Sequence, residues 1–301
     1  MAKPTVLLHI DCDAQASTFD SIVALDAGVQ QLISRSNVDL NDVQSLVHGA
    51  MFTRGPADLK NSAVFFGGSD VDKSDAMFAA ALDCFFGPMR VSVMSDPNGC
   101  NTTAAAAVLA CQRHIDLDNK HVVILGGTGP VGQRIAQIIC GLNLKGEVTV
   151  CSRNLDRAQS VVDGLSESSE QSASGLKTKL TAAALTTADE TLAVASTADV
   201  IFSAGAAGVE LLDQRWRETK ASVLLDLNAV PPAGIAGIDV TAAGIEIDGK
   251  TCYGAIGVGE LKMRIHKRAI QSLFESNDRV LDTQAIYELG KNLGIKTQKE
   301  C

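Results

Sequence analysis

The stretch His121-Val122-Val123-Ile124-Leu125-Gly126-Gly127-Thr128-Gly129-Pro130-Val131-Gly132 decides the fold. Its apolar run at 121–125 predicts a β-strand buried on both faces, as in a parallel sheet. The run leads directly into a Gly-x-Gly-x-x-Gly pattern that opens a helix, the context of a dinucleotide-binding turn. Such a turn brings backbone N–H groups and a helix N-terminus to a pyrophosphate. We therefore expect these residues to bind a cofactor: Gly127, Thr128, Gly129, Pro130, Val131 and Gly132. The alternative is a glycine-rich turn without a ligand.

The segment after the next strand indicates which dinucleotide is bound. Cys151-Ser152-Arg153-Asn154-Leu155-Asp156-Arg157 has no acid at the strand end, where NAD sites commonly carry one for the ribose 2′-hydroxyl. Arg153 and Arg157 offer guanidinium groups for a 2′-phosphate, and the Ser152 hydroxyl is a further donor. The sequence thus favours NADP over NAD. Solvated arginines at a helix start are the alternative.

Two further loops follow strands of the same expected sheet. Ser203-Ala204-Gly205-Ala206-Ala207-Gly208 follows one strand, and Asp226-Leu227-Asn228-Ala229-Val230-Pro231-Pro232 follows the next. Small residues there leave room for ribose and nicotinamide, so we expect Ala204, Gly205 and Asn228 at the cofactor. Ordinary turns are an equally good interpretation.

The surrounding sequence predicts an α/β protein with a Rossmann-type parallel sheet domain, a second α/β domain and a cleft between them. Strands and helices alternate through the first third of the chain, and a polar stretch at 116–120 marks a boundary. We therefore expect a substrate domain at 1–115 and a cofactor domain at 116–264. Helices within 265–301 are expected to pack back on the first domain. A helix from 155 to about 165 is expected to precede a serine-rich loop at 166–175.

Composition excludes several classes of protein. The 301 residues carry a net charge of −9, which disfavours a nucleic-acid binder. No apolar run approaches the roughly 20 residues of a membrane-spanning helix, and no signal peptide is recognisable. Eight cysteines include no Cys-x-x-Cys pair, so we expect neither structural zinc nor another metal. These features predict a soluble cytoplasmic protein.

Four motifs carry a resemblance to a known family: Phe86-Gly87-Pro88-Met89-Arg90-Val91-Ser92, Asp96-Pro97-Asn98-Gly99-Cys100-Asn101-Thr102-Thr103-Ala104-Ala105-Ala106, the glycine-rich turn, and Tyr253-Gly254-Ala255-Ile256-Gly257-Val258-Gly259-Glu260-Leu261-Lys262. Together they resemble the NADP-dependent methylene-tetrahydromethanopterin dehydrogenases of methylotrophic and related bacteria. The resemblance implies hydride transfer from the methylene group of a reduced pterin carrier to NADP, leaving a methenyl cation, in one-carbon (formaldehyde) metabolism. It also implies a homo-oligomer.

This chemistry is consistent with the absence of a recognisable acid–base set. The flanking nitrogen lone pair drives hydride departure, so the protein mainly aligns the reactants and excludes water. We expect Lys262 to orient the pterin ring, and Asp20 to bind its amino-pyrimidine edge. Further candidates at the substrate are Asn98, Asn101, Thr102 and Thr103. The structural alternatives are a surface lysine at a helix start for Lys262 and a helix carboxylate that serves only the helix dipole for Asp20. For Asn98 the alternative is a turn, and for Thr102 it is a helix cap. All five histidines are interpreted as structural.

Three other functions stay open at this point. A methylene-tetrahydrofolate dehydrogenase acts on nearly the same reacting ring, and some relatives accept or prefer that carrier. A shikimate-dehydrogenase-like NADP reductase needs a Lys–Asp pair in the N-terminal domain, where Lys60 and Lys73 have no convincing setting. A non-catalytic NADP sensor would bind the cofactor without turnover.

Overall fold

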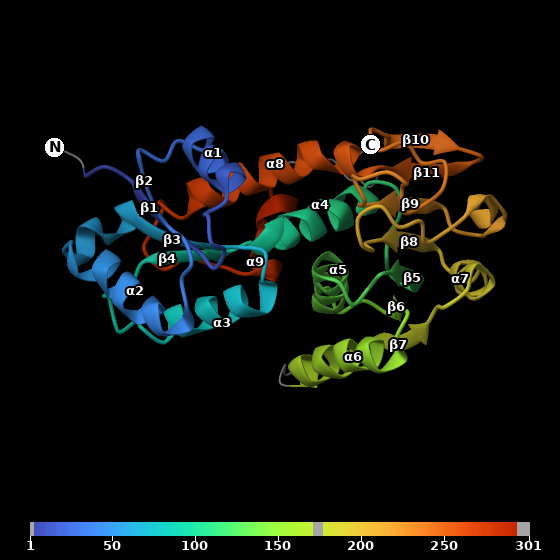
Figure 1. Ribbon diagram of the computed structural model, residues 1–301, viewed down its shortest axis with the longest axis horizontal. Coiled ribbons are helices and arrows are strands. Elements are labelled where there is room, and N and C mark those ends of the chain that lie inside the picture. The colour runs from blue at the N-terminus through green and yellow to red at the C-terminus, as the bar shows by residue number, and fades with distance from the viewer. Residues whose placement is uncertain (1–2, 171–176, 294–301) are drawn as a thin grey trace. The chain divides into compact units, whose positions relative to one another are not determined.

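The computed structural model describes residues 3–170 and 177–293, which form two compact units (Figure 1). Unit 1 comprises Met1–Thr102 and Met263–Leu289, and unit 2 comprises Thr103–Lys262 with Gly290–Cys301. The boundaries fall inside three helices: α4 (Cys100–Gln112), α8 (Ala255–Ser272) and α9 (Thr283–Lys291). No helix of the described residues is both long enough and apolar enough to cross a membrane.

Unit 1 is built on a five-stranded parallel sheet in the order β12-β4-β3-β1-β2. Its strands are β1 (Val6–Asp11), β2 (Gln31–Arg35), β3 (Ser62–Gly67), β4 (Ser92–Ser95) and β12 (Val280–Leu281). The helices between the first four strands are α1 (Thr18–Asp26), α2 (Val43–Phe52) and α3 (Val71–Leu82). The central strand β3 is buried at every residue, which explains its unbroken apolar run Ala63-Val64-Phe65-Phe66.

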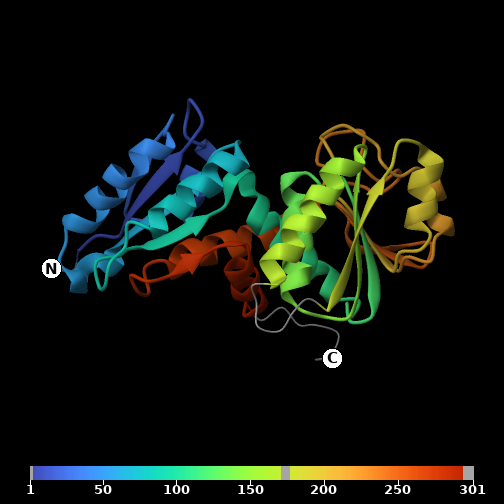
Figure 2. The same cartoon turned by 90° about the horizontal axis from the view of Figure 1, so that it is seen from below.

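Unit 2 is built on a seven-stranded sheet in the order β10-β11-β9-β8-β5-β6-β7. Its strands are β5 (Lys120–Leu125), β6 (Gly146–Ser152), β7 (Thr178–Ala184), β8 (Val200–Ser203), β9 (Val223–Asp226), β10 (Ala243–Ile247) and β11 (Lys250–Tyr253). Only the β10–β11 pair is antiparallel. Helices α5 (Pro130–Gly141) and α6 (Leu155–Glu170) cover one face, and α7 (Ala188–Ala195) lies on the other (Figure 2). The strand order reverses between β5 and β8, the point where open α/β sheets bind ligands.

The predicted fold class is confirmed, and several predicted boundaries differ. The sequence placed the domain boundary at 115/116, whereas the units divide at Thr102–Thr103 inside α4. The helix continues through this point because its alanine-rich sequence contains no breaker. Helix α6 extends to Glu170 rather than ending near 165, and residues 171–176 of the predicted loop lie outside the described residues. So do residues 294–301 of the C-terminal segment, whose residues 263–289 belong to unit 1.

Helix α8 begins at Ala255, so the glycine-containing segment that leads to Lys262 is helical. Gly257 permits close packing rather than flexibility, because a Cβ there would overlap the carbonyl oxygen of Ala242. At Gly259, two residues farther along, an added Cβ would have no heavy atom of another element within 4 Å.

This difference between two glycines of one helix is testable by alanine substitution. We expect Gly257→Ala to lower the free energy of unfolding by about 1–3 kcal/mol, since backbone must move away from the added methyl group. Gly259→Ala is the matched control and should raise stability by about 0.4–1 kcal/mol, because it reduces the entropy of the unfolded chain. Urea denaturation followed by circular dichroism measures both. Equal effects of the two substitutions would contradict the packing argument.

Candidate active site

An open pocket of about 540 Å³ lies at the carboxyl ends of β5, β6 and β8 in unit 2. Eight of the predicted cofactor residues line it: Thr128, Gly129, Pro130, Ser152, Arg153, Arg157, Ala204 and Gly205. The pocket therefore gathers three loops that are far apart in the sequence. Gly127, Val131, Gly132 and Asn228 are not among the lining residues.

The glycines of the turn bring α5 and two strands unusually close together. Gly126 has a φ of +70°, and a Cβ there would lie 2.5 Å from the Cα of Gly205. A Cβ at Gly132 would lie 2.7 Å from the Cα of Gly127, whose own N–H donates to the carbonyl of Cys151 at 2.8 Å. Gly127 and Gly132 thus shape the turn, and Gly129 begins α5 as its N-cap residue. The helix N-terminus consequently opens onto the pocket, which suits an anion.

The loop after β6 presents two arginines to the same pocket. The Ser152 hydroxyl accepts hydrogen bonds from the Thr128 hydroxyl at 3.3 Å and from the Asn154 N–H at 3.2 Å. The Asn154 side chain in turn accepts the N–H of Arg157 at 3.0 Å, which caps the start of α6. Arg153 and Arg157 are exposed, and none of the lining residues is acidic. The local charge therefore favours a phosphate.

The pocket is also lined by residues that the sequence did not indicate. The additional lining residues are Leu125, Gly126, Cys151, Asn154, Leu185, Thr191, Ala206, Val209 and Leu211. Leu185 directly follows β7, and Thr191 lies on α7. An apolar residue after a strand is a weak signal, because only the strand order places Leu185 and β7 beside β6. The mixed apolar lining suits a flat heteroaromatic ring.

Asn228 supports a loop rather than lining the pocket. Its Oδ1 accepts hydrogen bonds from the N–H groups of Gly208 at 3.4 Å and Val230 at 3.0 Å, and its Nδ2 donates to the Pro232 carbonyl. Asp226 is buried beneath it and accepts the N–H groups of Asn228 and Ile235. Burial raises the pKa of the Asp226 carboxyl. These bonds give Asn228 a structural role in joining two loops after β8 and β9.

A second polar site lies in unit 1, at the carboxyl ends of β1, β3 and β4. It is a cluster of ionisable side chains that are each less than a tenth exposed, which we call the buried cluster: His9, Asp11, Asp20, Asp96 and His266. His9 Nε2 lies 3.5 Å from Asp11 Oδ2, and His266 Nδ1 lies 3.8 Å from Asp96 Oδ2. Buried charges are costly unless they are balanced, so such a cluster indicates a functional site.

Asp20 is the predicted substrate residue that this cluster contains. It lies in the first turn of α1, where its N–H donates to the Ser17 hydroxyl at 3.2 Å, and its side chain is 7% exposed. Burial raises the pKa of the Asp20 carboxyl, the nearby Asp96 adds to this effect, and His266 and His9 oppose it. The cap is thus supplied by Ser17, and the Asp20 carboxylate is not needed as a cap.

The other predicted substrate residues differ in their surroundings. Asn101 is buried, donates to the Ser95 carbonyl and accepts the hydroxyl of Thr283 at 2.9 Å. Thr102 is also buried and donates to Asp96 Oδ2 at 2.6 Å. Both side chains therefore act within the frame of unit 1. Asn98 is exposed with a φ of +51°, as in a turn, and Thr103 is half-buried in unit 2.

Lys262 lies within α8 rather than at a helix start, and it is half-buried. His266 is four residues farther along the same helix, so the two side chains share one helix face. His266 is completely buried and was interpreted from the sequence as structural, like His9. The sequence carries no signal of a function for either histidine, because Phe65, which packs against both rings, and Asp96, which lies beside His266, are distant from them in the chain.

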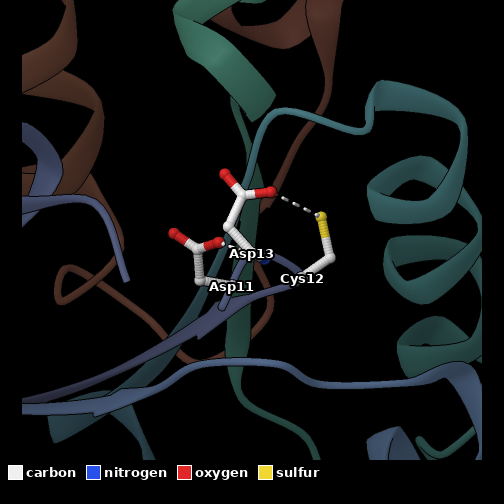
Figure 3. Close-up of side chains that lie close together, drawn as sticks. All are labelled: Asp11, Cys12 and Asp13. Atoms are coloured by element: carbon white, nitrogen blue, oxygen red, sulfur yellow. Dashed lines mark hydrogen bonds between the residues drawn. The ribbon is translucent and has the colours of Figure 1, made fainter. Parts of the chain in front are cut away.

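Asp11, Cys12 and Asp13 bring two carboxylates and a thiol close together (Figure 3). The Asp11 carboxylate accepts the N–H groups of Asp13 and Ser17, and Asp13 accepts the hydroxyl and N–H of Ser69. Burial would raise the pKa of Asp11, but these backbone bonds and His9 lower it overall. The oxygens thus tie the loop after β1 to the loop after β3, which is a structural role.

A shikimate-type reductase requires a lysine–aspartate pair, and among the described residues of unit 1 the pairs Lys73–Asp39 and Lys267–Asp26 lie at the surface. Lys73 forms an ion pair with Asp39, whose side chain is 68% exposed. Lys60 is exposed as well. Neither lysine belongs to the buried cluster.

Comparison with solved structures shows the fold alone. A shikimate 5-dehydrogenase from Listeria monocytogenes aligns with a TM-score of 0.51 and 11% identity, covering 95% of this chain and 96% of that one. An ornithine transcarbamoylase from Giardia lamblia aligns with a TM-score of 0.53 and 11% identity, covering 91% of this chain and 86% of that one. Proteins of different activity thus share this two-domain α/β architecture.

Comparison with known sequences shows the family. Residues 18–98 match the model of the methylene-tetrahydromethanopterin dehydrogenase N-terminal domain. A Methylorubrum extorquens protein named bifunctional protein MdtA is 39% identical, covering 96% of this chain and 98% of its own. The NAD(P)-dependent methylenetetrahydromethanopterin dehydrogenase of the same organism is 34% identical, covering 91% and 93%. These matches confirm the resemblance seen in the sequence motifs, and the chain therefore belongs to the methylene-tetrahydromethanopterin dehydrogenase family.

Proposed function

We propose that this protein transfers a hydride from the methylene group of methylene-tetrahydromethanopterin to NADP in one-carbon (formaldehyde) metabolism. The observation that carries the proposal is a sequence identity of 34%, over 91% of this chain, to a relative named as an NAD(P)-dependent dehydrogenase of that compound. A cytoplasmic location and a homo-oligomeric state, which the sequence predicts, are part of the same proposal.

The dinucleotide pocket supports NADP as the hydride acceptor. The pyrophosphate would lie at the N-terminus of α5, beside Thr128, Gly129 and Pro130. Arg153 and Arg157 would bind the 2′-phosphate, since both line the pocket and no lining residue is acidic. NAD sites commonly use an acidic side chain to bind the ribose 2′-hydroxyl, so the lining of this pocket favours NADP.

The buried cluster supports binding of the pterin in unit 1. An ionised Asp20 would accept two N–H groups from the amino-pyrimidine edge, the geometry that a carboxylate provides. Lys262 would orient the ring by donating to its carbonyl oxygen. Thr103 and Asn98 are further candidates, whereas Asn101 and Thr102 would act by holding Ser95, Asp96 and the start of α4 in place.

The reaction needs little acid–base help from the protein. The C–H bond of the methylene carbon breaks with its electron pair, and a neighbouring nitrogen lone pair forms the C=N bond of the methenyl cation. Bound NADP supplies the nicotinamide carbon that accepts this hydride, so no proton is released. The protein's tasks are to align the two carbons and to exclude water, which would hydrolyse the cation.

The first test is an initial-rate assay of NADPH formation. We expect turnover with methylene-tetrahydromethanopterin and NADP, and lower rates with NAD. Methylene-tetrahydrofolate is assayed in parallel, and a higher rate with that carrier would replace the proposed substrate. NADP binding without turnover of either pterin would contradict the proposal and favour an NADP sensor.

Removal of one arginine tests the cofactor assignment. Arg153→Ala should weaken NADP binding by about 10- to 100-fold, because a charge-assisted bond to phosphate contributes about 1.5–3 kcal/mol. NAD binding should change far less. Arg35→Ala, an exposed arginine of unit 1, is the control and should leave both affinities unchanged. Fluorescence titration measures the affinities, and equal losses for NADP and NAD would refute the assignment.

Lys262 is tested by separating turnover from cofactor binding. Lys262→Ala should lower kcat by about 10- to 100-fold, since misplacement of a reacting ring costs this order of rate. The affinity for NADP should stay unchanged. Arg264→Ala, an exposed position on the same helix, is the control. Unchanged turnover in Lys262→Ala would remove this lysine from the site.

A further inference from the structure

His266 is enclosed by the aromatic and acidic side chains of unit 1. Its ring stacks on Phe65 with centroids 5.8 Å apart, and Phe19 lies on another side at 6.3 Å. Its Nδ1 is 3.8 Å from Asp96 Oδ2, and the ring is completely buried. A histidine held in this way has little freedom to change its orientation.

Asp20 lies within the same enclosure. A Cβ at Gly67, the last residue of β3, would be 2.9 Å from His9 Nε2 and 3.5 Å from Asp20 Oδ2. These two polar atoms therefore face the same small space, which only a glycine leaves open. The ring of His9 packs edge-on against Phe65 at 5.2 Å, so Phe65 contacts both histidines.

The charges of this enclosure are nearly balanced only when histidine is protonated. Asp20 comes from α1, Asp96 follows β4, His266 comes from α8, and His9 and Asp11 come from β1. Each side chain is less than a tenth exposed, so water screens their charges weakly. Asp11 is already stabilised by the backbone N–H groups of Asp13 and Ser17, whereas the hydrogen bond that lowers the pKa of the Asp20 carboxyl comes from the Ser17 side chain.

We propose that His266 is a positioning residue for the substrate: its imidazolium offsets Asp96 and keeps Asp20 an ionised acceptor for the pterin. This inference rests on the proposed function, because it takes the amino-pyrimidine edge as the group that Asp20 binds. Asp96 acts in the opposite sense, as a second negative charge beside Asp20. The effects of the two neighbours on the Asp20 pKa agree with these roles, since His266 lowers that pKa and Asp96 raises it.

The sign of the pH dependence follows from these roles. Asp20 binds the pterin as a carboxylate, so kcat/KM for the pterin falls as pH decreases through the Asp20 pKa. Loss of the His266 charge raises this pKa and moves the fall to higher pH. Loss of the Asp96 charge lowers the pKa and moves the fall to lower pH.

The test compares His266→Gln and Asp96→Asn over a range of pH, with saturating NADP. At a pH on the acidic limb, His266→Gln should lose about tenfold in kcat/KM for each unit by which the pKa rises. At alkaline pH it should approach the wild-type protein. Asp96→Asn, which keeps an oxygen for the Thr102 N–H, should shift the limb in the opposite direction. The KM for NADP should stay unchanged in both.

Further variants separate positioning from simple loss of structure. Asp20→Asn should abolish the acidic limb, and adding His266→Gln to it should change kcat/KM little more. His48→Gln, a half-buried histidine on α2, is the matched control and should keep the wild-type profile. Calorimetric titration with tetrahydromethanopterin repeats the comparison without hydride transfer.

The outcomes are distinct. Opposite shifts of the acidic limb in the two variants support the proposal, and an unshifted limb with a uniform loss at every pH overturns it. If His266→Gln does not fold, the shift in Asp96→Asn decides. Failure of the wild-type protein to bind or turn over any pterin refutes the proposed function instead, and the pH comparison is then not reached.

Discussion

The close approach of α5 to the strands of unit 2 is the constraint on which the dinucleotide pocket depends. Gly132 packs on Gly127, and Gly126 packs on Gly205. There is no space for a Cβ at Gly126, Gly127 or Gly132. Because the backbones touch, the N-terminus of α5 and the loops after β6 and β8 open onto one volume. A methyl group added at Gly126 or Gly132 would meet the backbone of Gly205 or Gly127, so these elements would have to move apart.

The two units provide binding groups of different kinds. The pocket of unit 2 offers backbone N–H groups, a helix N-terminus and exposed arginines, which suit an anion that arrives from water. The buried cluster of unit 1 offers ionisable side chains that water screens little, so each charge strongly affects its neighbours. This division is consistent with the proposed function, in which the cofactor is anchored by its phosphates and the pterin by the polar edge of its ring.

Family and fold have different consequences for function. A shikimate dehydrogenase and a transcarbamoylase share the architecture at 11% identity, so the architecture does not select a reaction. The relatives at 39% and 34% identity extend over nearly the whole chain and therefore include both units. Selection of the substrate must then come from particular side chains, and the proposed function gives this role to Asp20 and its buried neighbours.

The sequence by itself determined the parallel sheet, the glycine-rich turn and the two arginines after β6, because each is encoded by residues adjacent in the chain. It did not determine where α8 begins, since the helical state of Gly257 depends on packing against Ala242. It interpreted His9 and His266 as structural, and it did not indicate the acidic side chains beside them or the hydrogen bonds that Asn101 makes with Ser95 and Thr283. Only the tertiary structure decided these points. The side chains of the buried cluster lose contact with water and balance one another's charges only where β1, α1, β4 and α8 pack together. Segments so distant in the chain leave no local sequence pattern that predicts this packing.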